Sequence, residues 1–269
     1  MATLATGPAR IHYSRTGDGP VAVLVQGVGV IGNGWKPQVD ALRDRYSLIT
    51  IDNRGIGRSS APGPLTIEDM AADVLAVADA EKVDRFHLVG HSMGGVIAQE
   101  IALTARTRVR SLALLCTFLK GRQGTTIAPS MLLTAVRSRV GTRAMRRRAF
   151  VELVMPPAHL SAVARNVLCA ELALLFGRDL ADSPPILMQQ LRAMGRFDAS
   201  ARLASLKDLR TVVVTAAHDC IARPAYGRAL AEAIPGARYV EFPDAGHAVT
   251  IQRADEISAL LADHFSTPS

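Results

Sequence analysis

The sequence contains the stretch Gly90-His91-Ser92-Met93-Gly94-Gly95, which directly follows the apolar run Phe86-His87-Leu88-Val89. A serine between glycines at this place is typical of a nucleophile elbow, in which a strand ends in a tight turn and a helix begins at once. A Cβ atom at Gly90 or Gly94 would crowd the turn, and the strained backbone lifts the Ser92 hydroxyl clear of the sheet. The Met93 N–H would then lie at the positive end of the helix, where an oxyanion is stabilised. A Gly-rich turn with a bystander serine is the alternative interpretation.

A serine nucleophile needs a base and an orienting acid. Two β-branched or aromatic runs late in the chain, residues 210–216 and 238–243, are followed by Asp219 and His247. The carboxyl ends of parallel strands meet at one edge of an open sheet, where ligands bind. We therefore expect Ser92, Asp219 and His247 to converge in one crevice. Asp244 is the alternative acid, but its position three residues before His247 favours a role in the local turn.

Other stretches follow in a characteristic order: Gln26-Gly27-Val28-Gly29 after an apolar run, then Trp35, then residues 52–59 with the sequence DNRGIGRS. With the elbow and the order nucleophile, acid, histidine, they make the chain similar to the α/β-hydrolase superfamily over nearly its whole length. The resemblance implies that Ser92 is the nucleophile, His247 the general base, and Asp219 the carboxylate that fixes the imidazole tautomer. It also implies that the Met93 and Val28 N–H groups form the oxyanion hole.

The chain departs from the family pattern at two positions. Gln26 stands where many members have histidine, and Ala216 stands where many have glycine. The first change leaves the Val28 N–H in place, since a backbone donor does not depend on its neighbour's side chain, and Gln26 can hold the loop by hydrogen bonds. Alanine in place of glycine at position 216 predicts that the turn before Asp219 differs in detail from the turn in other family members. Residues 52–55 are expected to lock loops beside the site.

Short apolar runs at residues 21–25, 47–51 and 111–116 have the form of strands buried on both faces of a parallel sheet. They alternate with helical patterns: Thr66 followed by Asp69 predicts a helix start, and residues 96–103 continue as the helix behind Ser92. This alternation predicts an α/β fold with a doubly wound, mostly parallel sheet.

Residues 120–193 have a different pattern, because apolar residues recur there at helical spacing and proline pairs interrupt them. We predict a helical cap (lid) at 120–193, inserted into a core domain formed by 1–119 and 194–269. Packing among the cap helices is the default use of its apolar residues, but a lid must also wall the pocket. The residues expected at the substrate are Gly27, Trp35, Met131, Leu172 and Phe176, with core packing as the favoured alternative for Trp35.

The composition argues against several other classes of protein, namely disulfide-rich, membrane-inserted and nucleic-acid-binding proteins. The chain has 269 residues, 49% of them apolar, and three cysteines, which predicts one catalytic unit in a reducing compartment rather than a disulfide framework. It lacks a signal-peptide pattern and any run of about 18 apolar residues, so we expect a cytoplasmic protein without membrane insertion. The net charge of +7 is concentrated in an arginine cluster at residues 137–148. No aromatic residues interleave with it, so a solvated helix face is expected and nucleic-acid binding is not.

Neither a metal nor a cofactor is expected. His12, His159, His218 and His264 have no partners at metal-ligand spacing. The glycines at 27, 29 and 32 do not match the dinucleotide-binding pattern G-x-G-x-x-G. Cys220 lies beside Asp219, and simple packing is favoured over a role as a reactive thiol.

The predicted function is that of a serine hydrolase, which cleaves a carboxylic ester or a lactone through an acyl-enzyme. An apolar cap, with no cationic anchor in the catalytic motifs, favours a small, uncharged, mostly apolar substrate. Alternatives with the same triad are a C–C bond hydrolase of ring-fission products, a thioesterase or an amidase. An epoxide or haloalkane hydrolase would require aspartate in place of Ser92. A non-catalytic sensor of a small ligand on the same fold is the alternative of another class.

Overall fold

The computed structural model describes residues 1–126 and 131–266. Among these residues, eight strands form a single sheet in the order β1-β2-β4-β3-β5-β6-β7-β8. Strands β1 (Ala2–Thr6) and β2 (Ala9–Thr16) are antiparallel to their neighbours. The remaining strands pair in parallel: β3 (Val21–Val25), β4 (Ser47–Ile51), β5 (Phe86–His91), β6 (Val109–Leu115), β7 (Thr211–Ala216) and β8 (Arg238–Phe242). The predicted doubly wound, mostly parallel sheet is confirmed.

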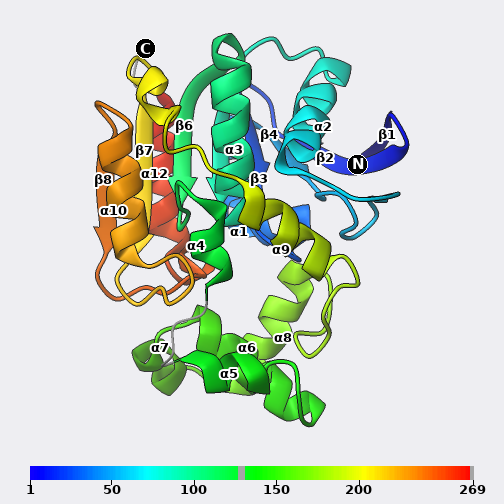
Figure 1. The fold of residues 1–269 in the computed structure, drawn as a ribbon, viewed down its shortest axis with the longest axis vertical. Helices are drawn as coiled ribbons and strands as arrows, with labels where there is room; N and C mark the ends of the chain where they lie inside the picture. The colour runs from blue at the N-terminus through cyan, green and yellow to red at the C-terminus, as the bar shows by residue number, and fades with distance from the viewer. Residues whose placement is uncertain (127–130, 267–269) are drawn as a thin grey trace.

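Helices cover both faces of this sheet (Figure 1). Helices α2 (Ile67–Ala80), α3 (Met93–Thr104) and α10 (Pro224–Ala233) lie in front of it in this view. Helices α1 (Lys36–Leu42) and α12 (Ala254–Ser266) pack against each other on the opposite face. The short helix α11 (Val249–Gln252) precedes α12, and 3-10 turns occur at Gly32–Trp35, Arg106–Arg108 and Leu203–Leu206. The main core lies between these helices and the central strands β3 to β7, which are buried on both faces, while the edge strands β1 and β8 are partly exposed.

The start of α2 follows the predicted capping box. The Asp69 N–H donates to the Thr66 hydroxyl at 3.0 Å, and the Thr66 N–H donates to the Asp69 carboxylate at 2.9 Å. These two bonds satisfy donors that the first turn of a helix leaves free. The residues expected on one face, Ile67, Met70, Val74 and Val77, are all buried.

Between β6 and β7 the described residues form helices and connecting segments: α4 (Gly121–Thr125), α5 (Leu132–Arg137), α6 (Arg143–Val154), α7 (Pro157–Ala162), α8 (Arg165–Phe176) and α9 (Leu187–Arg196). Figure 1 shows α5 to α8 grouped beyond one end of the sheet, with α4 and α9 between them and the core. A second hydrophobic cluster joins α6, α7 and α8 to Val30 and Ala248, which follow β3 and β8. The group α5–α8 is therefore anchored over loops at the carboxyl ends of the strands.

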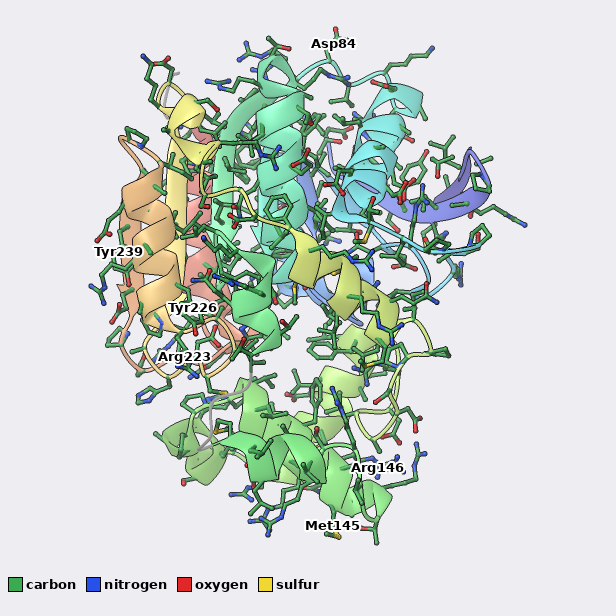
Figure 2. All side chains as sticks on the ribbon, viewed as in Figure 1. Asp84, Met145, Arg146, Arg223, Tyr226 and Tyr239 are labelled. Carbon is green, nitrogen blue, oxygen red and sulfur yellow. The ribbon has the colours of Figure 1, made fainter. Side chains whose placement is uncertain are left out.

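Three of the six arginines in the cluster at residues 137–148 form ion pairs within the described residues. Arg143 donates to Asp179 and Asp182, and Arg147 donates to Asp179. Arg148 pairs with Glu152 one turn along α6. Figure 2 shows Arg146 on the α5–α8 group, far from the sheet. Much of the positive charge of this segment is therefore matched locally by carboxylates.

No described helix is both long enough and apolar enough to cross a lipid bilayer.

Candidate active site

Ser92 lies in the turn between β5, which ends at His91, and α3, which begins at Met93. Its backbone has φ 55° and ψ −121°, in the left-handed half of the Ramachandran plot that non-glycine residues rarely enter. The flanking glycines allow this turn: a Cβ at Gly90 would lie 2.2 Å from the Gly94 oxygen, and one at Gly94 would lie 2.0 Å from the Val25 oxygen. The strand, strained turn and helix expected around Ser92 are all present.

Asp219 follows β7, His247 follows β8, and their side chains are in contact. His247 Nδ1 lies 2.7 Å from Asp219 Oδ2, and the other carboxylate oxygen accepts the N–H groups of Ile221 and Ala222 at 2.8 Å each. Burial raises the pKa of the Asp219 carboxyl, but the His247 imidazole and the two N–H donors outweigh it, so the net pKa lies below the usual range. Asp219 is therefore an anion that accepts the Nδ1 proton, which leaves His247 Nε2 as the proton acceptor.

Asp244, the alternative acid, is placed differently. Its carboxylate is exposed and pairs with Arg253, and its backbone carbonyl accepts from the Gln252 side chain at 2.9 Å. Among the described residues, it is Asp219 whose carboxylate meets the His247 imidazole.

Ser92 and His247 line the same cavity, which has a volume of about 280 Å³. Gly27, Met131 and Phe176, three of the residues expected at the substrate, also line it. Trp35 and Leu172 do not, and this corrects our expectation for them. Trp35 is fully buried in the main core, with its ring edge toward His91, while Leu172 is buried in the second cluster. An apolar helical pattern does not by itself separate the face that packs from the face that lines a pocket.

The loop after β3 lies directly against Ser92. A Cβ at Gly27 would be 3.0 Å from Ser92 Cβ and 3.4 Å from Ser92 Oγ, so a larger residue here would press on the Ser92 side chain. The next residue, Val28, lines the cavity, and its N–H has no hydrogen-bond partner within the described ranges. Met93 is the first residue of α3, so its N–H is one of the donors that a helix start leaves free. Among the described residues, the Val28 N–H is thus free at the cavity wall, and the Met93 N–H is free at the helix start that follows Ser92.

Hydrogen bonds hold this loop in place. The Asn53 side chain donates to the Gln26 carbonyl at 2.8 Å, and the Gly27 N–H donates to the Gln26 side chain at 3.2 Å. Beside them, the Asp52 carboxylate accepts the N–H groups of Gly32 and Arg58. The loop-locking role expected for residues 52–55 agrees with these contacts.

Gln190 is a loop-holding residue that the sequence analysis missed. It is fully buried on α9, accepts the Gly29 N–H at 3.0 Å and donates to the Arg54 carbonyl at 3.1 Å. It thereby bridges the loop after β3 and the loop after β4. A sequence signal existed, because Gln190 falls on the apolar stripe of α9 together with Leu187, Leu191 and Met194. A polar residue on such a stripe needs buried partners.

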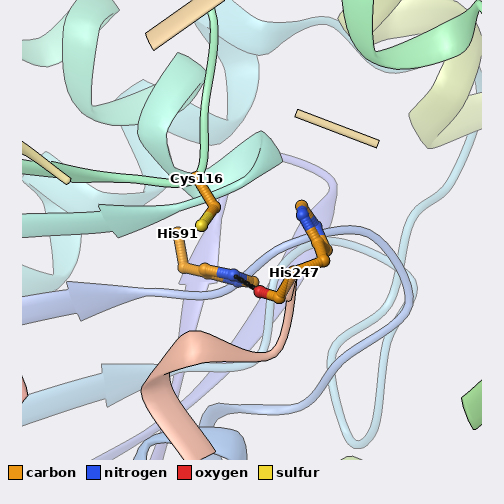
Figure 3. Close-up of side chains that lie close together, drawn as sticks. All are labelled: His91, Cys116 and His247. Carbon is orange, nitrogen blue, oxygen red and sulfur yellow. Dashed lines mark hydrogen bonds between the residues drawn. The ribbon is translucent and has the colours of Figure 1, made fainter. Parts of the chain in front are cut away.

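His91, Cys116 and His247 offer nitrogen and sulfur atoms within 4.8 Å of one another, a group that spacing did not reveal (Figure 3). One ring nitrogen of each histidine is hydrogen-bonded, while His91 Nδ1 is buried and has no hydrogen-bond partner among the described residues. His91 Nε2 donates to the His247 carbonyl at 2.8 Å, the dashed line in Figure 3, and His247 Nδ1 is bonded to Asp219. Burial and the nearby Asp219 carboxylate raise the pKa of the Cys116 thiol, which keeps it protonated. The bond from His91 to the His247 carbonyl ties the His247 loop to the end of β5.

Cys220 forms part of the cavity wall. Its thiol donates to the Leu153 carbonyl at 3.2 Å, which ties the β7 loop to α6. Burial raises the pKa of this thiol to about 11, so it is a neutral group at physiological pH. These contacts favour packing over nucleophilic reactivity.

The match to known proteins defines the class. The alpha/beta hydrolase fold family matches residues 20–254, and the chain belongs to that family. It is 33% identical to the protein described as "Putative carbamate hydrolase RutD" from Klebsiella pneumoniae (strain 342), over 91% of this chain and 90% of the relative.

Two solved structures show the same likeness. The enol-lactonase from Burkholderia xenovorans LB400 superposes with a TM-score of 0.82 at 29% identity, over 99% of this chain and 100% of that one. Est816, described as an N-acyl homoserine lactone degrading enzyme, superposes with a TM-score of 0.80 at 26% identity, over 97% and 99% of the two chains. The particular chain described here is thus an α/β hydrolase that resembles hydrolases of several acyl compounds.

Proposed function

We propose that the protein is a serine hydrolase that cleaves a carboxylic ester or a lactone through an acyl-enzyme intermediate. The observation that carries this proposal is the geometry of one cavity: a strained Ser92 lines it together with His247, whose imidazole is hydrogen-bonded to a buried carboxylate. Carbamates, lactones and esters all present a carbonyl carbon to a nucleophile, so the names of the relatives support this class of reaction.

The proposed reaction begins when His247 Nε2 takes the Ser92 proton and Ser92 Oγ attacks the carbonyl carbon. The carbonyl oxygen becomes an oxyanion bound by the Val28 and Met93 N–H groups. One such donor typically contributes about 3 kcal/mol to transition-state stabilisation. His247 then protonates the leaving alcohol, and in a lactone that alcohol stays attached to the acyl group. Water, activated by the same imidazole, attacks the acyl-enzyme, and the carboxylic acid is released.

We further propose that α5–α8 act as a lid over this cavity, which assigns residues 120–193 to a cap and the rest of the chain to the core. Met131 and Phe176 from this segment line the cavity with Ser92, which supports the proposal. The expected partner is a small molecule, and no resident cofactor is proposed for the reaction.

A panel of p-nitrophenyl esters, lactones and ring-fission dienones, assayed with purified protein, tests this function. We expect turnover of esters or lactones by the native protein and its loss in Ser92→Ala. The control is Ser60→Ala, since Ser60 is an exposed residue on another loop. Turnover of dienones alone would move the activity to C–C bond hydrolysis. Ligand binding without turnover of any compound would support the sensor instead.

A further inference from the structure

Arg178 lies in the wall of the cavity, outside every motif used above, and Arg139 and Asp182 line the same cavity. Arg178 comes two residues after the end of α8, where Gly177 closes the helix with a left-handed backbone (φ 69°). Its side chain is half-buried and lines the cavity together with Ser92 and His247. The apolar part of the cavity wall includes Val30, Phe150, Leu153, Leu187 and Ile251.

Neutral groups fix the orientation of the Arg178 guanidinium. Its Nε donates to the Gly29 carbonyl at 3.2 Å, and Nη1 donates to the carbonyls of Asp179 and Asp182. Its Cζ lies 5.5 Å from the centre of the Phe150 ring. Nη2 has no hydrogen-bond partner in the part of the chain that the structure describes, and it lies 3.6 Å from the position that a Cβ on Gly29 would occupy. The donor that remains free is therefore beside the oxyanion loop.

The charge of Arg178 is not matched locally. The two nearby carboxylates, Asp179 and Asp182, are bonded through their side chains to Arg143 and Arg147, and Arg178 meets only their backbone. The guanidinium groups of Arg143, Arg147 and Arg178 thus lie near only two carboxylates, and Arg178 bonds neither of them. Burial lowers the pKa of Arg178, which is the expected sign for a desolvated cation, yet a guanidinium stays protonated at neutral pH. A partly buried cation with a free donor is the usual recognition element for a carboxylate.

We propose that Arg178 binds a carboxylate on the substrate, so that the ester or lactone of this enzyme carries an anionic group a short distance from its carbonyl. This inference rests on the proposed hydrolase function and deepens it. Gly27 contacts Ser92, and Gly29 lies next to Arg178 Nη2. These two glycines are two residues apart, and two residues of extended chain span about 7 Å at most. A small substrate can therefore reach Arg178 with its carboxylate while it presents its carbonyl carbon to Ser92, since both side chains line one cavity. The inference also replaces the uncharged substrate expected from the motifs alone.

The substrate test compares two esters of equal length, monoethyl glutarate and ethyl pentanoate, by proton release. We expect the native enzyme to favour the glutarate. Arg178→Gln should lower kcat/KM for the glutarate by about 10- to 100-fold, the loss of one hydrogen bond between charged groups, and change the pentanoate by no more than about threefold. Arg178→Lys should restore part of the preference. The matched control is Arg148→Gln, an arginine that pairs with Glu152 on the surface and should leave both rates unchanged.

A purely structural role for Arg178, through its bond to Gly29, predicts a different result. Both esters would then lose rate equally in Arg178→Gln, and this outcome would overturn the proposal, as would a native enzyme with no preference for the glutarate. Circular dichroism and the melting temperature of each variant show whether the fold is retained, and Arg178→Lys serves as the readout where the glutamine variant does not fold.

A second measurement separates this proposal from the proposed function. If neither ester is turned over, the binding of free glutarate to the native protein and to Arg178→Gln is measured by calorimetry. Binding that weakens about 10-fold or more in the variant supports the anion site even where the hydrolase assignment fails. Absence of glutarate binding to the native protein, together with labelling of Ser92 by a fluorophosphonate, would overturn the anion site and leave the hydrolase assignment in place.

Discussion

At the scale of single residues, the site depends on a hydrogen bond that selects one tautomer of one imidazole. Asp219 is fully buried and holds its negative charge because it accepts bonds from His247, Ile221 and Ala222. An asparagine at position 219 could donate its amide N–H to His247 Nδ1. This bond would favour the imidazole tautomer whose proton lies on Nε2, which cannot accept the Ser92 proton. Asp244 has no such relation to the imidazole, since its carboxylate pairs with Arg253.

The two aspartates are therefore expected to respond very differently to substitution by asparagine. Asp219→Asn should lower kcat by roughly 10³- to 10⁴-fold, because His247 loses the partner that orients it. Asp244→Asn should change kcat by less than about threefold. Steady-state rates with the best ester of the panel measure both effects. The reverse ranking would move the orienting acid to Asp244.

His247 itself is expected to be dispensable for folding and essential for turnover. It lies on a loop at the cavity, so His247→Ala removes the proposed base and leaves the sheet and its helices unchanged. Turnover of a p-nitrophenyl ester should fall by at least about 10³-fold, while the far-ultraviolet circular dichroism stays the same. Native-level turnover in this variant would refute the assigned base.

At the scale of elements, α9 holds the loop after β3, which carries the proposed oxyanion donor Val28, through Gln190. Its side chain accepts the Gly29 N–H and donates to the Arg54 carbonyl, so two loops depend on one amide. Gln190→Ala removes both bonds and leaves the loop free to shift, and a shift of about 1 Å is enough to cost roughly 100-fold in rate. The neighbouring Gln189 is exposed and supplies the matched control.

We therefore expect Gln190→Ala to lower kcat by about 10- to 100-fold and Gln189→Ala to leave it unchanged. A loss confined to KM would mean that Gln190 shapes the substrate pocket and does not hold the oxyanion donors. Comparison of kcat and KM for both variants on one ester separates these outcomes.

The elements also show which parts of the structure could be predicted from sequence. The elbow, the capping box at Thr66 and the buried strands are local patterns, because a few contiguous residues determine each of them. Arg178, Gln190 and the true position of Leu172 depend on how the helices between β6 and β7 pack on one another and on the core. An amphipathic pattern permits several such packings, so these contacts could not be read from the chain.

At the scale of the whole molecule, three buried histidines couple folding to pH. Burial, as the largest cause, lowers the pKa of His91 to about 3 and the pKa values of His87 and His264 to about 4. Each ring is held neutral by burial while one nitrogen hydrogen-bonds to Ser111, the His247 carbonyl or the Leu112 carbonyl. In the unfolded chain the same groups bind a proton below about pH 6.5.

Acid should therefore destabilise the protein before its carboxylates titrate. Between about pH 6.5 and 4.5 the unfolded state binds protons that the native state does not, so the free energy of unfolding falls as pH falls. Each histidine contributes at most about 1.4 kcal/mol per pH unit. Urea unfolding at about pH 7, 6 and 5 measures the slope, and His264→Gln should reduce it by roughly one third. Stability that is constant or rises over this range would contradict the burial of neutral histidines.

Ser92 is the proposed nucleophile, activated by His247, and a fluorophosphonate probe reacts with such a serine. Treatment of the native protein with this probe, followed by peptide mass spectrometry, should give a single covalent adduct on the peptide that contains Ser92. We expect the adduct to be absent in Ser92→Ala and to form far more slowly in His247→Ala. An unmodified Ser92 in the folded native protein, or an adduct on a different residue, would contradict the assignment of Ser92 as the nucleophile.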